Sequence, residues 1–169
     1  MRLRAVTLGD LWLYERLRCD PVMTSELGGP QQHEDMPAKL SDDVAAVERD
    51  ESWISVVETD DGAVTGSVCI WQHEEQGERI SEIGWMVLPE FQGRGLGRDA
   101  TTAILERARA DGRWGAIHAF PAVTNGPSNA ICRSLGFTLL ETTDFDYNGA
   151  SLHTNHWRLD PTGGSDFAD

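Results

Sequence analysis

Three glycines, Gly93, Gly95 and Gly97, lie at the junction of an apolar run, 83–88, and an amphipathic run that begins at Leu96. This order predicts a strand that feeds a tight turn, which then opens onto the first turn of a helix. The first backbone N–H groups of a helix have no partner within the helix, and the helix dipole makes that end favourable for an anion. Glycines adopt positive φ and carry no side chain, so a phosphate group can approach the backbone itself. The segment therefore predicts a phosphate-binding turn.

Two common phosphate-binding motifs do not fit this turn. A Walker motif needs a Lys-Ser/Thr pair after the glycines, where this chain has Arg98 followed by Asp99. A dinucleotide-binding motif needs Gly or Ala three residues after Gly95, and that position is again Arg98. On these residues alone, a purely structural glycine turn is the remaining alternative.

Two segments resemble the signatures of the GNAT superfamily of acyl-CoA N-acyltransferases. The pattern Gln-x-x-Gly-x-Gly at 92–97, preceded by a strand and a proline, is similar to its pyrophosphate-binding signature. In 125–137, an Asn precedes a short helical stretch and then Leu-Gly-Phe, which is similar to its second signature. Only 82–97 and 125–137 are diagnostic. The overall layout resembles the branch that includes ribosomal-protein N-terminal acetyltransferases.

The resemblance implies an α/β (α+β) fold with a mixed, mostly antiparallel sheet of about six or seven strands. That sheet would be splayed between its fourth and fifth strands and flanked by about four helices. It also implies that acetyl-CoA is the co-substrate and binds in the splay, where a primary amine attacks it directly in a ternary complex. By the same resemblance, the loop between the first two helices borders the site of the amine acceptor.

The resemblance also assigns residues to the coenzyme. Backbone groups of Trp85, Met86 and Val87 are expected to pair with the pantetheine arm, as an added strand would. Asn125 and Ser128 are expected to contact the same arm, although both residue types also suit the cap of a helix. The turn expected to hold the diphosphate comprises Gln92, Gly93, Arg94, Gly95, Leu96, Gly97 and Arg98. 

Glu82 is the candidate general base for acyl transfer to an amine. It lies on the expected fourth strand, where related enzymes often place a catalytic glutamate, and an apolar run follows it. Partial burial would bring a carboxylate pKa closer to neutrality. A glutamate that faces solvent is the alternative, in which case Asp144 or Asp146 could take the role. Gly84, two residues on, would either permit a bulge that splays the strand or serve packing.

Cys132 occupies the position at which many relatives carry a tyrosine that protonates the leaving thiolate, seven residues after Asn125. A thiol of pKa about 8.5 could donate a proton there, but a small buried hydrophobic residue is the alternative. A Cys132–His118 pair that forms an acyl-enzyme is a more remote alternative. The five histidines show no metal-binding spacing, so we expect no metal.

Bulk properties exclude several classes of function. The 169 residues carry a formal net charge of −14, which argues against nucleic acid and against an anionic membrane surface as partners. No apolar run approaches the length of a membrane span, and no secretory signal is evident. Three scattered cysteines without CxxC spacing indicate a reducing, cytoplasmic location. A cationic amine acceptor would suit the acidity, which also serves solubility.

The elements that would position these residues follow from hydrophobic periodicity. Residues 1–160 are expected to form a single acyl-CoA N-acyltransferase domain, and the acidic tail, 161–169, is expected to fray. Residues 22–40 are interpreted as a loop. Helices are expected at 7–18, 41–49, 96–111 and 128–135, and strands at 52–58, 64–72, 81–88, 114–122, 137–144 and 151–159. 

Two rival functions belong to other classes. One is a domain that binds acyl-CoA as a sensor or interaction module without turnover, which the missing tyrosine favours. The other is a structural subunit that keeps the fold for a homodimer and binds no coenzyme. The sequence leaves the identity of the amine acceptor open.

Overall fold

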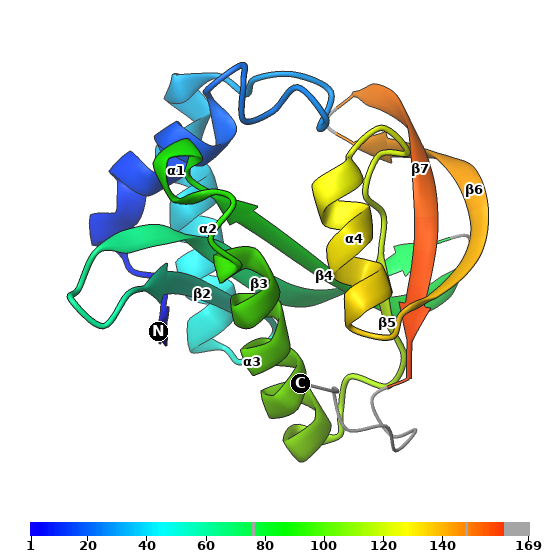
Figure 1. The fold of residues 1–169 in the computed structure, drawn as a ribbon. Coiled ribbons are helices and arrows are strands. Elements are labelled where there is room, and N and C mark those ends of the chain that lie inside the picture. The colour runs from blue at the N-terminus through cyan, green and yellow to red at the C-terminus, as the bar shows by residue number, and fades with distance from the viewer. Residues whose placement is uncertain (76, 148, 161–169) are drawn as a thin grey trace.

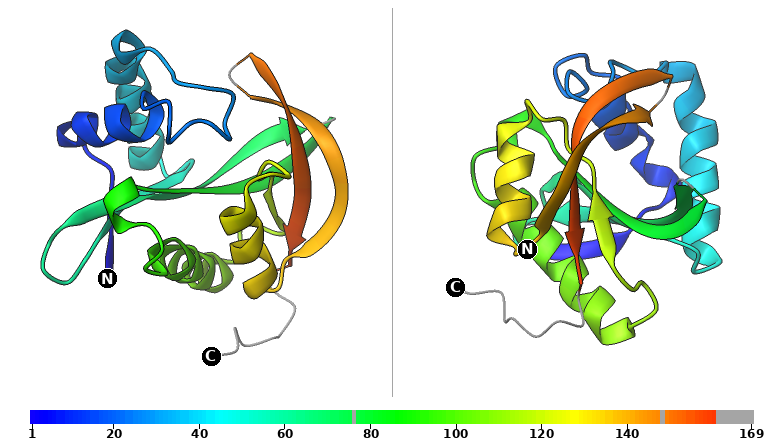
Figure 2. Two further views of the ribbon diagram at one scale, coloured as in Figure 1. Left: turned by 45° about the horizontal axis from the view of Figure 1, so that its top comes forward. Right: turned by 90° about the vertical axis from the view of Figure 1, so that its right-hand side faces the viewer.

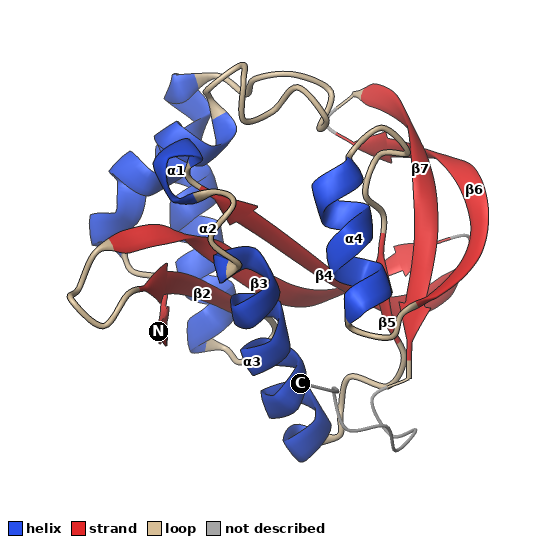
Figure 3. Cartoon of the chain, viewed as in Figure 1, coloured by secondary structure: helices blue, strands red, loops and turns tan. Residues whose placement is uncertain are grey.

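The computed structural model describes residues 1–75, 77–147 and 149–160, and the predicted acidic tail lies outside them. The described residues form a seven-stranded sheet with the strand order β1-β2-β3-β4-β5-β7-β6. Figure 1 shows how the α-helices lie around the sheet, and Figure 3 separates helices from strands by colour. The strands are β1 (Arg2–Ala5), β2 (Trp53–Glu58), β3 (Val64–Glu75), β4 (Glu78–Val87), β5 (Ile117–Ala119), β6 (Thr138–Tyr147) and β7 (Ala150–Leu159). The α-helices are α1 (Leu11–Arg18), α2 (Met36–Glu48), α3 (Leu96–Asp111) and α4 (Gly126–Ser134). 

The helices cover both faces of the sheet, two on each. In the left view of Figure 2, α1 and α2 lie above the sheet, whereas α3 and α4 lie below it. Each pair has its own apolar core. Alternation along the strands supplies both cores, since successive side chains of a strand point to opposite faces.

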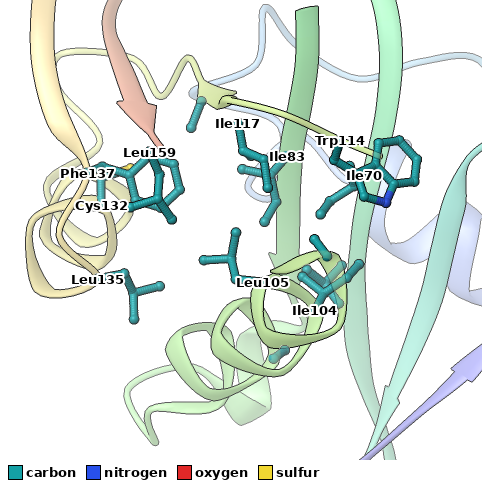
Figure 4. Close-up of a cluster of buried hydrophobic side chains, with 14 of the residues drawn as sticks. Ile70, Ile83, Ile104, Leu105, Trp114, Ile117, Cys132, Leu135, Phe137 and Leu159 are labelled. Atoms are coloured by element: carbon teal, nitrogen blue, oxygen red, sulfur yellow. The ribbon is translucent and has the colours of Figure 1, made fainter. Parts of the chain in front are cut away.

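The larger core joins α3 and α4 to the sheet. Ile104 and Leu105 of α3 pack against Ile70 of β3 and Ile83 of β4 (Figure 4), and all four side chains are buried. The second core places Leu13, Leu17, Met36 and Leu40 of α1 and α2 against Val56 of β2. Burying these side chains removes apolar surface from water, which is the main stabilising contribution to a fold of this size.

The sheet is splayed between β4 and β5. These two strands run parallel but pair at only two positions, Ser81 with Ile117 and Glu82 with His118. On its other side β4 pairs with β3 over ten residues without a register shift. The half of β4 that follows Glu82 therefore has one edge that β5 does not cover.

The structure confirms the expected class of fold and corrects several boundaries. Helix α2 begins at Met36 and not at residue 41, because Met36 and Leu40 are buried in the second core. The expected turn at 73–78 is much shorter, since β3 continues to Glu75 and β4 begins at Glu78. Strand β5 covers only three residues of the expected 114–122. Strand β1 was not predicted.

Candidate active site

A cavity of about 710 Å³ lies at the splay. Its wall comes from β3, β4, the turn before α3, the segment that follows β5, the start of α4 and the loop after α1. Of the fourteen predicted site residues, twelve line it: Glu82, Trp85, Met86, Val87, Gln92, Gly93, Gly95, Leu96, Gly97, Arg98, Asn125 and Ser128. Arg94 and Cys132 are not part of the wall. The structure thus brings together two motifs that are about thirty residues apart in the chain.

The turn before α3 has the geometry of an anion site. Gly95 is the N-cap residue and has a φ of 80°, a left-handed conformation that L side chains rarely adopt. A Cβ atom built on Gly95 would point into open space, with Asp99 Oδ2 the nearest atom at 4.0 Å. Behind this N-terminus, α3 contributes the dipole of sixteen residues. Arg98 adds a positive charge to the wall.

The side chains of Gln92 and Arg94 stabilise the turn itself. Gln92 Nε2 donates a hydrogen bond to the carbonyl oxygen of Val87 at 2.9 Å, which ties the turn to the end of β4. Arg94 donates to the carbonyl oxygen of Glu90 at 2.8 Å, and its guanidinium group lies over the ring of Phe91. Arg94 therefore has a structural role that the sequence did not reveal.

The uncovered edge of β4 presents backbone groups to the cavity. The N–H of Leu88 donates to the carbonyl oxygen of Thr65, at 2.8 Å, so Leu88 is bonded to the β3 side. Alternate residues of a strand direct their amides to opposite edges. The amides of Trp85 and Val87 consequently face the side from which β5 has diverged, while that of Met86 faces β3. Met86 lines the cavity through its side chain and is not expected to offer its backbone there.

Gly84 is a packing glycine and not the site of a bulge. The register between β3 and β4 is continuous through it. A Cβ atom on Gly84 would lie 3.4 Å from the ring of Trp71 and 3.5 Å from the Sγ atom of Cys69. The splay is instead accompanied by a close approach at Gly66, where a Cβ atom would lie only 2.1 Å from the carbonyl oxygen of Met86.

Glu82 lies at the last residue pair that joins β4 to β5 and reaches the cavity wall. Its side chain is 12% exposed, and its Oε2 atom lies 2.7 Å from the Nε2 atom of His73. The indole of Trp71 and the ring of Phe120 line the same wall. Glu82 is thus a largely buried carboxylate beside an imidazole, at the point where the sheet opens.

Cys132 lies in the core between α3, α4 and the sheet. Its side chain is fully buried beside Leu135, Phe137 and Leu159 (Figure 4). Burial raises the pKa of its thiol to about 12. Cys132 therefore packs in the core, and it does not line the cavity that Glu82 lines. His118 does not line the cavity either, and its Nδ1 atom lies 2.7 Å from His156 Nε2.

Asn125 caps α4 and lines the cavity at the same time. Its Oδ1 atom accepts a hydrogen bond from the N–H of Ser128 at 3.1 Å. Asn129, which was not predicted, fixes this segment from behind. Its amide nitrogen donates to the carbonyl oxygens of Ala122 and Asn125, and its Oδ1 atom accepts from Trp157 Nε1 at 2.9 Å.

The loop after α1 also lines the cavity, and its contact residues had no signal in the sequence. Met23, Glu26 and Leu27 line the cavity. Glu26 accepts a hydrogen bond from the hydroxyl of Thr124, so the loop closes onto the segment that follows β5. The thiol of Cys69 also lines the cavity, and burial raises its pKa to about 11.

Within the part of the chain that the structure describes, no group of three or more His, Cys, Asp or Glu side chains is arranged to hold a metal ion. No helix of the described residues is long and apolar enough to cross a bilayer.

The candidate site consists of the uncovered edge of β4, the N-terminus of α3, Asn125 and the Glu82–His73 pair.

A sequence model of the acetyltransferase (GNAT) domain matches residues 1–138, most of the chain. The chain is a GNAT acetyltransferase. Among curated proteins, no sequence matches this acetyltransferase. Many solved structures share its fold, although the identities are low enough that the likeness establishes the fold alone.

Three of those structures show the range of the family. One is the Salmonella typhimurium acetyltransferase that modifies the N-terminal serine of ribosomal protein L7/L12, with 17% identity, a TM-score of 0.76 and coverage of 94% of this chain and 93% of that chain. Another is spermidine N-acetyltransferase from Vibrio cholerae in complex with CoA and spermine. It has 20% identity and a TM-score of 0.75, and the match covers 93% of this chain and 92% of that chain. A third is yncA, a putative acetyltransferase from Salmonella typhimurium, with its cofactor acetyl-CoA. It has 22% identity and a TM-score of 0.74, and the match covers 98% of this chain and 96% of that chain. This GNAT acetyltransferase is thus similar in fold to enzymes with protein and small-molecule acceptors.

Proposed function

We propose that this acyltransferase moves the acetyl group of acetyl-CoA to a primary amine by direct attack in a ternary complex. The observation that carries the proposal is the position of the cavity. It joins the uncovered edge of β4 to the N-terminus of α3, so one ligand can contact both. An extended arm that ends in a diphosphate is the kind of ligand that fits such a pair of features.

The turn before α3 is the proposed diphosphate site. N–H groups at the helix N-terminus and the guanidinium group of Arg98 would bind the anion, and the absence of a Cβ at Gly95 leaves room for it. The amides of Trp85 and Val87 would hold the pantetheine arm. An N–H of this edge can also donate to the thioester oxygen, which favours the charge that develops there during attack.

The reaction needs a proton acceptor beside the amine. An ammonium group must lose a proton before its lone pair can attack, and the Glu82 carboxylate lies on the cavity wall to receive that proton directly or through water. The amine nitrogen then bonds to the carbonyl carbon, the bond between that carbon and sulfur breaks, and the nitrogen releases its second proton to water as the amide forms. Because Cys132 is buried elsewhere, we assign it no part in this step, and the thiolate leaves without a dedicated acid.

Substitution of Gly95 by Ala tests the coenzyme site. The methyl group would occupy the space proposed for the diphosphate, so the affinity for acetyl-CoA should fall at least about tenfold, or 1.4 kcal/mol, in calorimetric titration. Gly112→Ala is the matched control, because Gly112 ends the same helix with a φ of 79° and open space around its Cβ position. Both variants strain a left-handed residue by about 1 kcal/mol, but only Gly95 faces the cavity. Equal binding by both variants would contradict the proposed site.

Release of free thiol from acetyl-CoA tests turnover. A panel of acceptors should include peptides with a free N-terminus and polyamines, which are the acceptor types named for the structural neighbours. Glu82→Gln should reduce kcat by about two orders of magnitude and leave the affinity for acetyl-CoA unchanged.

The burial of a cysteine at the position of the family's tyrosine favours one second candidate, a domain that binds acyl-CoA without turnover. Binding of acetyl-CoA with no thiol release on any acceptor would support that candidate.

A further inference from the structure

His73 contacts the proposed base, although it was not predicted as a site residue and does not line the cavity. Its Nε2 atom lies 2.7 Å from Glu82 Oε2, and the two side chains are 26% and 12% exposed. A pair that is mostly shielded from solvent interacts more strongly than an ion pair on the surface.

The register of the hairpin fixes this contact. Trp71 of β3 pairs with Glu82 of β4, and His73 lies two residues beyond Trp71 on the same face. His73 is therefore the diagonal neighbour of Glu82 across the two strands. The Trp71 indole stacks on the imidazole, with ring centroids 6.3 Å apart and planes at 25°. Trp71 also lines the cavity, so it links the wall of the site to His73.

Other titratable and charged groups face this pair from the elements around it. His118 of β5 pairs with Glu82 along the sheet, but burial and the neighbouring His156 lower its pKa to about 4, so it is neutral at pH 7. Among the described residues, Cys69 on β3 interacts electrostatically with Glu82, Arg18 and Asp43, and His118 does so with His73, His156 and Arg158. Glu82 is a carboxylate partner of His73, since its Oε2 atom lies 2.7 Å from His73 Nε2.

We propose that His73 is a positioning residue for Glu82, holding its Oε2 atom through the Nε2–H so that the carboxylate is oriented to accept the proton of the amine. A carboxylate has two acceptor oxygens, and a hydrogen bond from an imidazole favours its ionised form. The proton moves from the ammonium nitrogen to Glu82, the nitrogen lone pair attacks, and Glu82 later returns the proton to water. The inference rests on the proposed role of Glu82 as base.

Three substitutions at the pair test the inference. His73→Phe removes the donor, and it should lower kcat at least about tenfold and move the acid limb of the pH profile of kcat/KM to higher pH, with acetyl-CoA affinity unchanged. His73→Gln places an amide N–H near the same point and should restore most of the activity. In a Glu82→Gln background, His73→Phe should have no further effect on kcat, because residues that act as one unit are not additive.

His153→Phe is the matched control. His153 is also a histidine beside a carboxylate across two strands, 3.1 Å from Asp144, but it is exposed and does not line the cavity. Its substitution should leave both the rate and the pH profile at wild-type values. A wild-type profile for His73→Phe, together with a slow Glu82→Gln, would overturn the inference and leave the proposed function intact. Wild-type turnover by Glu82→Gln would instead remove the base assignment itself.

A second measurement needs no change at His73. The imidazole of His73 can be titrated by NMR in the wild type and in Glu82→Gln, since loss of the carboxylate removes the partner that favours the imidazolium. The midpoint for His73 should fall in Glu82→Gln, while that for His153 stays constant. An unchanged midpoint for His73 would overturn the inference even if His73→Phe does not fold.

Discussion

At the residue scale, His118 shows how burial changes a titratable group beside the site. Its Nδ1 atom lies 2.7 Å from His156 Nε2, and the ring of His156 stacks on Phe120 with centroids 4.5 Å apart. Burial, together with the second imidazole, lowers the pKa of His118 to about 4. Two protonated imidazoles at this distance would repel one another, so the folded state keeps His118 neutral.

Because the pKa of His118 is lowered, the free energy of unfolding depends on pH in the mildly acidic range. The unfolded chain protonates His118 near pH 6.5, whereas the folded chain does so only near 4. Between these values the unfolded state binds more protons, so the free energy of unfolding falls as pH is lowered through that window. We expect Tm to fall between pH 7 and 5, and to fall less in His118→Phe. The same fall in both proteins would contradict the assignment, and His153→Phe should behave as the wild type.

At the element scale, the β3–β4 pair carries the site. One face of this pair carries Trp71, His73 and Glu82, and the uncovered edge is the edge of β4 that points away from β3. Its end is held by Gly66, whose Cα allows the carbonyl group of Met86 to approach. The strand can therefore keep its register with β3 while its far edge stays clear of β5.

Substitution of Gly66 by Ala should disturb this pair. The Cβ atom would lie 2.1 Å from the carbonyl oxygen of Met86, and neither backbone can move without breaking ladder hydrogen bonds. Overpacking of this kind costs typically about 1–3 kcal/mol, to be measured by urea unfolding. Gly126→Ala is the control, because no atom lies within 4 Å of its Cβ position at the start of α4. If the free energy of unfolding falls no more in Gly66→Ala than in the control, the strands adapt to the added methyl group.

At the scale of the whole molecule, charge opposes the proposed coenzyme. The chain has 28 acidic and 14 basic residues, and its formal net charge is −14. Acetyl-CoA is itself an anion, so the long-range field should slow its approach even though Arg98 and the N-terminus of α3 attract it locally. A cationic amine would be attracted by the same field.

The dependence of the association rate on salt tests this repulsion between the acidic protein and acetyl-CoA. Between about 20 and 300 mM ionic strength the Debye length falls from about 20 Å to about 6 Å, which screens the net charge more than the local contacts. We therefore expect the association rate of acetyl-CoA, measured by stopped flow, to rise with salt. Arg98→Gln should steepen that rise because it removes the local attraction. An association rate that falls with salt would show that the local positive potential dominates.

The sequence by itself determined the parts of the site whose geometry is local. Glycines at 93–97 before an amphipathic run are sufficient to predict a turn at a helix N-terminus, and α3 does begin at Leu96 and end before Gly112. The cap at Asn125 is local for the same reason. Neighbouring residues decide such features through φ preferences and short-range hydrogen bonds.

Only the tertiary structure decided which residues meet across the sheet. The contact between Glu82 and His73 depends on the register of two strands, and the burial of Cys132 depends on how α4 packs on α3. Helix α2 begins at Met36 because Met36 is buried against α1 and β2, although a polar tract precedes it. Burial and cross-strand contacts join residues far apart in the chain, so no local pattern specifies them.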